Sequence, residues 1–125
     1  EAAAGRDPLP RYVPPHEDPQ TKPGLAAKYP LQLVCPPSPS FLNSTFVNVD
    51  PLRAAAGGPV VELHPADADA RGIADGRPVR VWNDRGEFRA RAVVGESVRP
   101  GVAVTFGIWW RRWTADGANC NAVTS

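Results

Sequence analysis

The sequence predicts a mainly β fold, in which short strands close into a small barrel behind an extended, proline-rich N-terminal arm. Most of the 15 prolines precede residue 40, and proline fixes φ and removes a backbone donor, so this part cannot form helix or central strand. Beyond it, short valine-rich segments alternate with turn residues at near-regular spacing, which is typical of a barrel. The two or three helical segments between them are too short for the crossovers of a parallel α/β sheet.

The arm is expected over residues 1–29. Leu9, Tyr12 and Val13 are the apolar side chains that would anchor it. Two arrangements stay open: the arm wraps over its own protein, which we favour, or it presents a polyproline ligand to an SH3-like partner.

The barrel is expected over residues 30–125, enough chain for one domain with a real core. Its first strand is predicted at 31–35, where apolar and polar residues alternate. A helix is predicted at 52–56, because Asp50 suits the N-cap, Pro51 suits the first helical position, and a Gly-Gly pair follows.

Alternating or continuous apolar runs between turn residues predict four further strands: 60–63, 79–82, 87–94 and 102–106. After the first of these, Pro65 opens a short helix, Gly72 is its expected C′ residue, and Ile73 returns to the core. The second and third strands form a hairpin whose turn is residues 83–86. One hairpin face should be apolar and the other rich in arginine: Val79, Val81, Phe88, Ala90 and Ala92 against Arg80, Arg89 and Arg91.

Composition excludes several classes of protein. The net charge of +1 does not imply a nucleic-acid partner, although arginines outnumber acids after residue 70, which fits an anionic ligand as well as a solvated face. No apolar run reaches the ~20 residues of a membrane span, so we expect a soluble, cytoplasmic protein without membrane contact, unless a longer parent carried an export signal. Cys35 and Cys120 lack zinc-ligand spacing and are expected to be small apolar side chains or to lie beside a ligand.

The loop over residues 37–45 is the first of three segments with an excess of polar groups. Ser38, Asn43, Ser44 and Thr45 could bond a phosphate or the edge of a pterin. The same residue types are also ordinary in turns, so the residue types of the loop by themselves favour a structural role.

The hairpin turn is the second such segment, with an amide, a carboxylate, a guanidinium and a bare backbone at Asn83, Asp84, Arg85 and Gly86. An aspartate accepts two hydrogen bonds side by side, which matches the N1–H and exocyclic amine of guanine, and glycine allows close backbone approach. A plain hairpin turn uses the same residue types.

The third segment is residues 107–121, with three tryptophans close together and two asparagines after them. Trp109 with its neighbours could form a stacking wall, and Asn119 and Asn121 could offer amides to a flat heterocycle. Interleaved arginines would also suit single-stranded nucleic acid, and a tryptophan patch could pack on another domain. No catalytic constellation occurs: Ser44 has no evident His–Asp pair, and no phosphate-binding glycine loop opens a helix.

The order of these segments resembles the C-terminal molybdopterin-dinucleotide-binding domain of oxidoreductases of the dimethyl-sulfoxide-reductase type. The resemblance covers nearly the whole chain, including the arm. Its motifs, in chain order, are Pro-Ser-Pro-x-Phe-Leu-Asn-Ser-Thr-Phe, His-Pro-Ala-Asp-Ala-x-Ala-Arg-Gly-Ile-x-Asp-Gly, Asn-Asp-Arg-Gly, Val-Arg-Pro-Gly-Val, Trp-Trp and Asn-x-Asn.

The resemblance implies a double-psi β-barrel that binds molybdopterin guanine dinucleotide within a molybdenum or tungsten oxidoreductase. By motif, residues 38–45 would approach pterin and phosphate, Asn83 and Asp84 would address the guanosine, and Asn119 and Asn121 would reach a pterin. The metal would be held by the dithiolenes and by a ligand from another domain, so none is sought here.

The resemblance also implies partners, namely the remaining domains of the parent catalytic subunit. Without them the chain is expected to be inactive and to lack bound cofactor. Family members continue past Ser125 with a last strand, so the barrel is expected to stay open, with an edge through which the chain could self-associate. The alternative function is a protein-interaction module that uses the arm and the tryptophan-rich segment and binds no small molecule.

Overall fold

The computed structural model describes residues 9–124, and the chain divides into two compact units between Pro30 and Leu31. In the first unit, turns and irregular backbone lead into helix α1 (Pro23–Lys28). The prediction that residues 1–29 form only an extended arm is wrong at this helix. Pro23 occupies the first turn, where its missing N–H breaks no hydrogen bond, and the leucine and alanines after it favour helix.

The expected anchors of the arm are exposed in this unit. Leu9, Tyr12 and Val13 have exposed fractions of 73%, 80% and 73%. The wrapped arm therefore stays a prediction.

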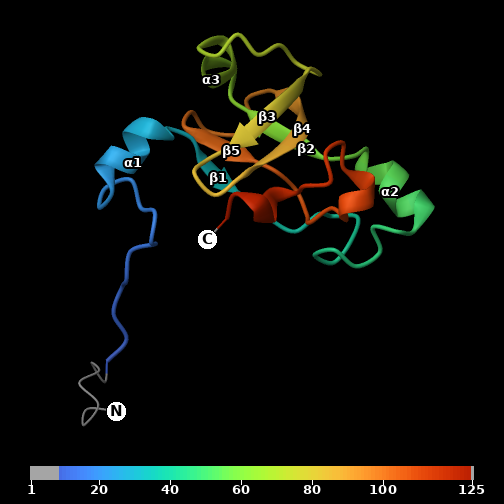
Figure 1. Cartoon of the computed structure of the whole chain (residues 1–125), viewed down its shortest axis with the longest axis horizontal. Helices are drawn as coiled ribbons and strands as arrows, with labels where there is room; N and C mark the ends of the chain where they lie inside the picture. The colour runs from blue at the N-terminus through green and yellow to red at the C-terminus, as the bar shows by residue number, and fades with distance from the viewer. Residues whose placement is uncertain (1–8, 125) are drawn as a thin grey trace. The chain divides into compact units, whose positions relative to one another are not determined.

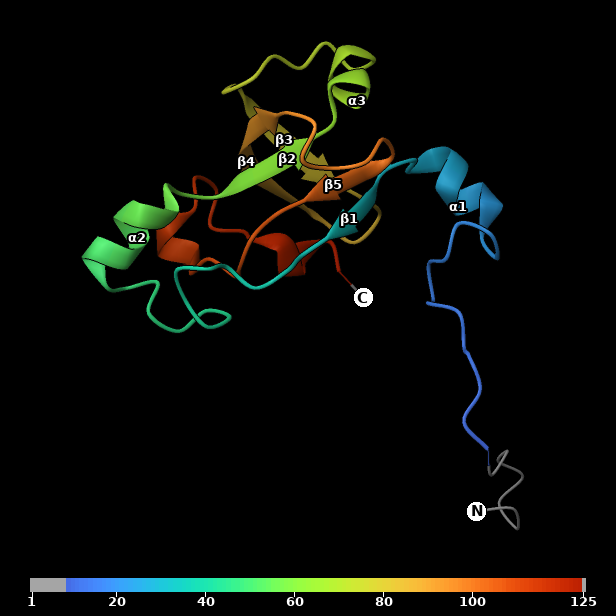
Figure 2. The ribbon, with the colours of Figure 1, turned by 180° about the vertical axis from the view of Figure 1, so that it is seen from behind.

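The second unit is built on one mixed sheet with strand order β1-β5-β2-β4-β3, which curls into a half-barrel (Figures 1 and 2). The prediction of a mainly β fold with few short helices is confirmed. The strands are β1 (Gln32–Val34), β2 (Val60–Leu63), β3 (Pro78–Trp82), β4 (Glu87–Val94) and β5 (Val102–Val104).

The sheet does not close between its two edge strands. The closed barrel expected from strand spacing is therefore wrong, and the sheet has the open edge that the family resemblance implied. Among the described strands, β1 and β3 are the edges and do not pair with each other. One reason is that β1 is only three residues long and Pro36 and Pro37 follow it, where each removes a backbone donor.

The pairing includes two parallel pairs that the sequence did not reveal. β1 runs parallel to β5 and β2 runs parallel to β4, while β5–β2 and β3–β4 are antiparallel. Between β2 and β4 the chain passes through a short helix, α3 (Pro65–Asp69), and through β3. The chain thus passes from β2 to its parallel partner β4 through the intervening strand β3. The long crossover helix that the sequence analysis required for a parallel pair is not needed here.

The hairpin of β3 and β4 has the predicted faces. Val79 lies opposite Ala90, and Val81 lies opposite Phe88, which is one of the most deeply buried side chains. Arginines occupy the exposed positions between them. The apolar face contributes to the main core, which also holds these buried residues of other elements: Val61, Leu63, Ala68, Ala103, Cys120 and Val123.

The start of helix α2 (Asp50–Ala56) differs by one residue from the prediction. Asp50 is the first helical residue, and Val49 is the N-cap without a side-chain hydrogen bond. The carboxylate of Asp50 instead pairs with the guanidinium of Arg53, at 2.6 Å. Gly57, with φ of +73°, ends the helix as predicted.

The end of α3 confirms the predicted glycine stop. Gly72 has φ of +64°, its N–H donates to the carbonyl of Asp69, and the N–H of Ile73 donates to the carbonyl of Ala68. This is the Schellman pattern, and it directs Ile73 back against the main core. Among residues 9–124, every helix is too short or too polar to traverse a lipid bilayer.

A second, smaller apolar cluster lies in the loops beside the sheet. Its buried members are Phe41, Val47 and Trp109, and Ala56 of α2 packs against them. We call this region, residues 38–57 with 107–114, the loop lobe.

Candidate functional site

All three polar segments leave the sheet at the same end. β1 and β5 finish at this end because they are parallel, and β2 begins here because it is antiparallel to β5. β4 runs parallel to β2, and Arg91 of β4 pairs with Val60 at the start of β2. The beginning of β4 and the β3–β4 turn therefore extend beyond this same end. We call this the loop end of the sheet; α3 follows the opposite end of β2, and the two ends can be told apart in Figure 1.

The loop after β1 is folded back on itself. Asn43 adopts a positive φ of 49°, and the N–H of Thr45 donates to the carbonyl of Leu42 at 2.7 Å. Ser38 is buried, and its Oγ accepts from the N–H of Ser40 at 3.1 Å. Ser38 therefore shapes the loop, whereas Asn43 and Thr45 are exposed on it.

The segment after β5 is fastened to this loop. The indole N–H of Trp110 donates to the carbonyl of Ser44 at 2.7 Å, and the N–H of Ile108 donates to the carbonyl of Asn43 at 3.3 Å. The side-chain amide of Asn119 donates to the carbonyl of Trp109 at 2.7 Å. Two of the three predicted segments thus form one hydrogen-bonded surface.

The hairpin turn is fastened to the 3₁₀ helix η3 (Cys120–Ala122). The Oδ1 of Asn83 accepts from the N–H groups of Arg85 and Gly86, at 2.9 and 3.3 Å, and its Nδ2 donates to the carbonyl of Val123 at 2.6 Å. At Gly86 an added Cβ would lie 2.8 Å from the carbonyl oxygen of Ala122. Glycine is therefore needed here for close packing on η3.

The structure divides the predicted site residues into two groups. One group holds the loops in place through buried packing or backbone hydrogen bonds: Ser38, Asn83, Gly86, Trp109 and Asn119. The other group is exposed at the surface of the loop end: Asn43, Thr45, Asp84, Arg85 and Asn121. Ser44 is half-buried, and its carbonyl accepts from Trp110.

Trp109 does not form the stacking wall expected of it. Its ring is 5% exposed and meets Phe41 edge to face, with ring centroids 5.3 Å apart. Within residues 107–121, the exposed indoles belong to Trp110 and to Trp113 of η2 (Arg111–Trp113).

Arginines stack on these exposed indoles. The guanidinium of Arg53 lies 3.8 Å from the ring centroid of Trp113, and that of Arg112 lies 4.8 Å from Trp110 and 5.0 Å from Trp113. The arginines adjacent in sequence to the tryptophans were noted from the sequence. The contribution of Arg53 was missed, because it comes from α2, far away in the chain.

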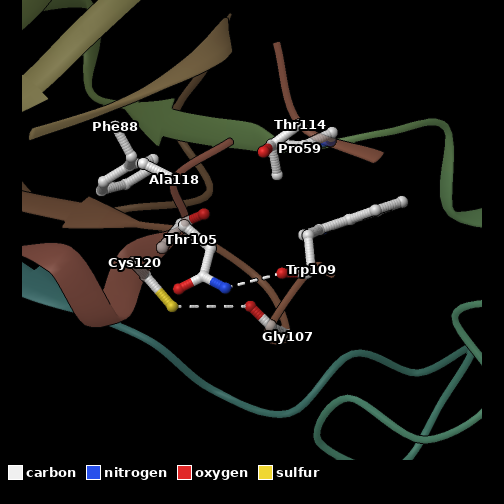
Figure 3. Close-up of a pocket in the computed structure, with 9 residues that line it drawn as sticks. Pro59, Phe88, Thr105, Gly107, Trp109, Thr114, Ala118 and Cys120 are labelled. Carbon is white, nitrogen blue, oxygen red and sulfur yellow. Dashed lines mark hydrogen bonds between the residues drawn. The ribbon is translucent and has the colours of Figure 1, made fainter. Parts of the chain in front are cut away.

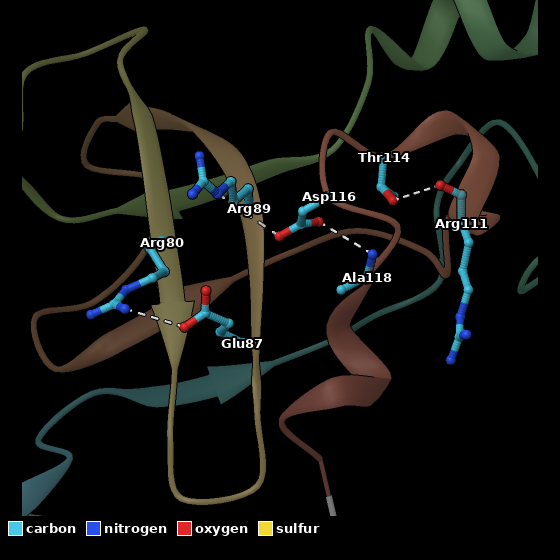
Figure 4. Close-up of polar contacts among 7 residues, drawn as sticks. All are labelled: Arg80, Glu87, Arg89, Arg111, Thr114, Asp116 and Ala118. Atoms are coloured by element: carbon cyan, nitrogen blue, oxygen red, sulfur yellow. Dashed lines mark hydrogen bonds and ion pairs between the residues drawn. The ribbon is translucent and has the colours of Figure 1, made fainter.

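One ion pair lies within the outer face of the hairpin, and a second connects this face to the C-terminal segment (Figure 4). Arg80 pairs with Glu87 at 3.2 Å, and Arg89 lies 4.0 Å from Asp116. Asp116 also accepts from the N–H of Ala118 at 3.2 Å. The arginine face is therefore partly neutralised within the chain, and its charge is not all available to an anion.

A small cavity lies behind the loop end (Figure 3), lined by residues that include Phe88, Thr105, Trp109 and Cys120. Its volume of about 10 Å³ is that of a single water molecule. This cavity is therefore too small for a dinucleotide.

Two features bear on metal and thiol chemistry. Within the described part of the chain, no three His, Cys, Asp or Glu side chains gather as a metal site. The thiols of Cys35 and Cys120 hydrogen-bond to each other, which raises the pKa of Cys35 and lowers the pKa of Cys120 to about 7. Sequence spacing gave no signal of this pair.

Comparison with known proteins gives one family and a set of long relatives. The family model for the "Molydopterin dinucleotide binding domain" matches residues 31–125. The chain is 41% identical over 101 residues to the probable oxidoreductase YoaE of Bacillus subtilis, covering 81% of this chain and 14% of that protein. It is 43% identical over 105 residues to the dimethyl sulfoxide reductase DmsA of Escherichia coli, covering 83% of this chain and 12% of that protein.

A solved structure shares the fold. The acetylene hydratase from Pelobacter acetylenicus superimposes with a TM-score of 0.82 at 25% identity, over 99% of this chain and 19% of that one. The chain thus corresponds to a small part of each of these proteins.

Proposed function

The chain belongs to the molybdopterin-dinucleotide-binding domain family, and from this premise we propose that it binds molybdopterin guanine dinucleotide. We propose further that it does so as the C-terminal domain of the catalytic subunit of a molybdenum or tungsten oxidoreductase. Its relatives, of which it spans 14% and 12%, include proteins named as oxidoreductases. When bound, the cofactor supplies the redox-active metal, and the chain supplies binding and orientation.

The observation that carries the proposal is that the three polar segments meet at the loop end. Segments that left the sheet at different ends could not touch one ligand. Hydrogen bonds of Asn83 and Asn119 to distant backbone carbonyls hold these segments in register, at 2.6 and 2.7 Å. Because both amides are engaged in this way, we assign them a positioning role rather than contact with the cofactor.

We assign the guanosine to the hairpin turn. Asp84 and Arg85 are exposed at its tip, and Asn83 fixes the turn that presents them. A carboxylate accepts from N1–H and the exocyclic amine of guanine at once, and this pairing would favour guanine over adenine.

We assign the pterin and phosphate to the surface between the first loop and η3. Asn43, Thr45 and Asn121 present exposed amides and a hydroxyl there, and such groups donate to pterin and phosphate oxygens. These groups would bind one side of the cofactor, and other domains of a longer subunit would cover its other side.

We also propose that the half-barrel is part of a double-psi β-barrel. The support is the two parallel pairs, β1–β5 and β2–β4, of which the second is joined through an intervening strand rather than a crossover helix.

A titration of the chain with GDP, followed by backbone amide NMR, tests the guanosine assignment. We expect shifts at residues 83–86 and 119–123, and Asp84→Ala should remove those at the hairpin turn. Asp69→Ala is the matched control, since Asp69 is also exposed but lies on α3, away from the loop end. Unchanged spectra at millimolar GDP, or an equal effect of the two variants, would contradict the assignment.

A further inference from the structure

The two cysteines flank one glycine at the loop end. Cys35 follows β1, and the next residue, Pro36, accepts from the N–H of Gly107 at 2.9 Å. The carbonyl of the same Gly107 lies 3.7 Å from the Sγ of Cys120, which opens η3 (Figure 3). The peptide units of Gly107 thus bring the end of β1 and the start of η3 together.

Strand alternation directs Cys35 toward Cys120. The backbone stays extended past β1, because the N–H of Thr105 still donates to the carbonyl of Val34 at 3.0 Å. Cys35 therefore shares a face with Leu33, which packs against the main core that contains Cys120. Val34 points to the other face and is 47% exposed.

The pair combines an accessible sulfur with a reactive one. Cys35 is exposed, whereas Cys120 is 4% exposed, and both are free thiols. The neighbouring Cys35 thiol lowers the pKa of Cys120 through a hydrogen bond, which favours the thiolate form of Cys120. Thiolate is the form of cysteine that attacks sulfur.

We propose that Cys35 and Cys120 are an oxidation site that forms a reversible disulfide across the loop end. With hydrogen peroxide as oxidant, the Cys35 sulfur bonds to one peroxide oxygen, the O–O bond breaks, and the departing hydroxide leaves as water with the thiol proton. The Cys120 thiolate then attacks the Cys35 sulfenic sulfur. The S–S bond forms, the S–O bond breaks, and the second hydroxide takes a proton from solvent.

In balance, two thiols lose two electrons and one peroxide molecule becomes two water molecules. The bond ties the end of β1 to η3, and η3 already packs on the hairpin turn through Ala122 and Gly86. Oxidation therefore locks together the segments that form the loop end. A small dithiol reverses it by exchange.

The test starts from the reduced chain treated with hydrogen peroxide, followed by alkylation, digestion and mass spectrometry. We expect both thiols to be lost, the monomer mass to fall by two hydrogens, and the peptides of Cys35 and Cys120 to be joined. The melting temperature should rise on oxidation and return after reduction, because the cross-link restricts the unfolded chain.

A shifted thiol provides the matched control. The double variant Cys35→Ser with Val34→Cys keeps two thiols but moves one to the opposite face of β1, so it should form no intramolecular disulfide and show no rise in melting temperature. The proposal is overturned if the natural chain gives only sulfinic acid or dimers linked between molecules. It is also overturned if the shifted variant cross-links as readily.

Discussion

The β3–β4 hairpin and the loop lobe bury large aromatic side chains equally well, but they are built from different kinds of contact. In the hairpin, Phe88 is 2% exposed and its neighbours come from adjacent strands joined by a four-residue turn. In the loop lobe, Trp109 is 5% exposed and packs on Phe41, which is far away in the sequence. Local periodicity describes the first region, and only long-range contacts define the second.

This difference predicts different consequences when each region is weakened. Phe88→Ala should have the largest effect, a loss of about 3–5 kcal/mol in the free energy of unfolding, since it removes an aromatic ring from the main core. Urea denaturation should show one cooperative transition at a lower midpoint. A loss below about 1 kcal/mol would mean that the hairpin is not part of the cooperative core.

Trp109→Ala should have the next largest effect, a loss of about 3 kcal/mol in the free energy of unfolding. The cost is smaller than for Phe88 because the surrounding loops can partly collapse into the space that the indole leaves. Hydrogen exchange should speed up for residues 41–56 and 107–113, while β3 and β4 keep their protection. If the hairpin amides lose protection to the same degree, the two regions form one cooperative unit and the comparison fails.

Gly86→Ala tests the contact between the hairpin turn and η3. The new methyl would lie 2.8 Å from the backbone carbonyl of Ala122, so we expect a cost of about 1–3 kcal/mol and a shift of the amides of η3. Gly95→Ala is the matched control, because a Cβ at Gly95 meets nothing within 4 Å. Equal stability of the two variants would show that the turn does not rest on η3.

Arg53→Gln should give the smallest effect, about 0.5–1.5 kcal/mol. It removes a guanidinium that stacks on Trp113, pairs with exposed Asp50 and donates to the carbonyl of Val47. The indole N–H resonance of Trp113 should shift, and the indole N–H resonance of buried Trp109 should not. Arg99→Gln is the control on an exposed arginine of the turn before β5. An unmoved Trp113 resonance would place the Arg53 side chain elsewhere in solution.

The same contrast explains what the sequence could predict. The faces of the hairpin, the glycine stops after Ala56 and Arg71, and the mainly β class all follow from local periodicity and turn chemistry, and the structure confirms them. The family predicted from motif order is confirmed by the match over residues 31–125.

The rest depends on contacts between distant segments. The parallel pairs, the stacking of Arg53 on Trp113 and the meeting of Cys35 with Cys120 each join residues with no shared local pattern. The sequence predicts which segments form the candidate site. It does not predict which of their residues hold the loops in place and which are exposed to a ligand. Whether an amide such as Asn83 faces a ligand or a backbone carbonyl is decided by η3, which no spacing of residues around Asn83 reveals.

The pairing of β1 with β5 also sets an order of events during synthesis. β1 spans Gln32–Val34, and the strand it pairs with, Val102–Val104, leaves the ribosome only after β2, β3 and β4 have already emerged. The hairpin can therefore form early, while β1 waits with its backbone donors and acceptors unpaired. A nascent chain paused before residue 102 would expose β1 as an unpaired strand edge. This is the stage at which the chain would most need a chaperone.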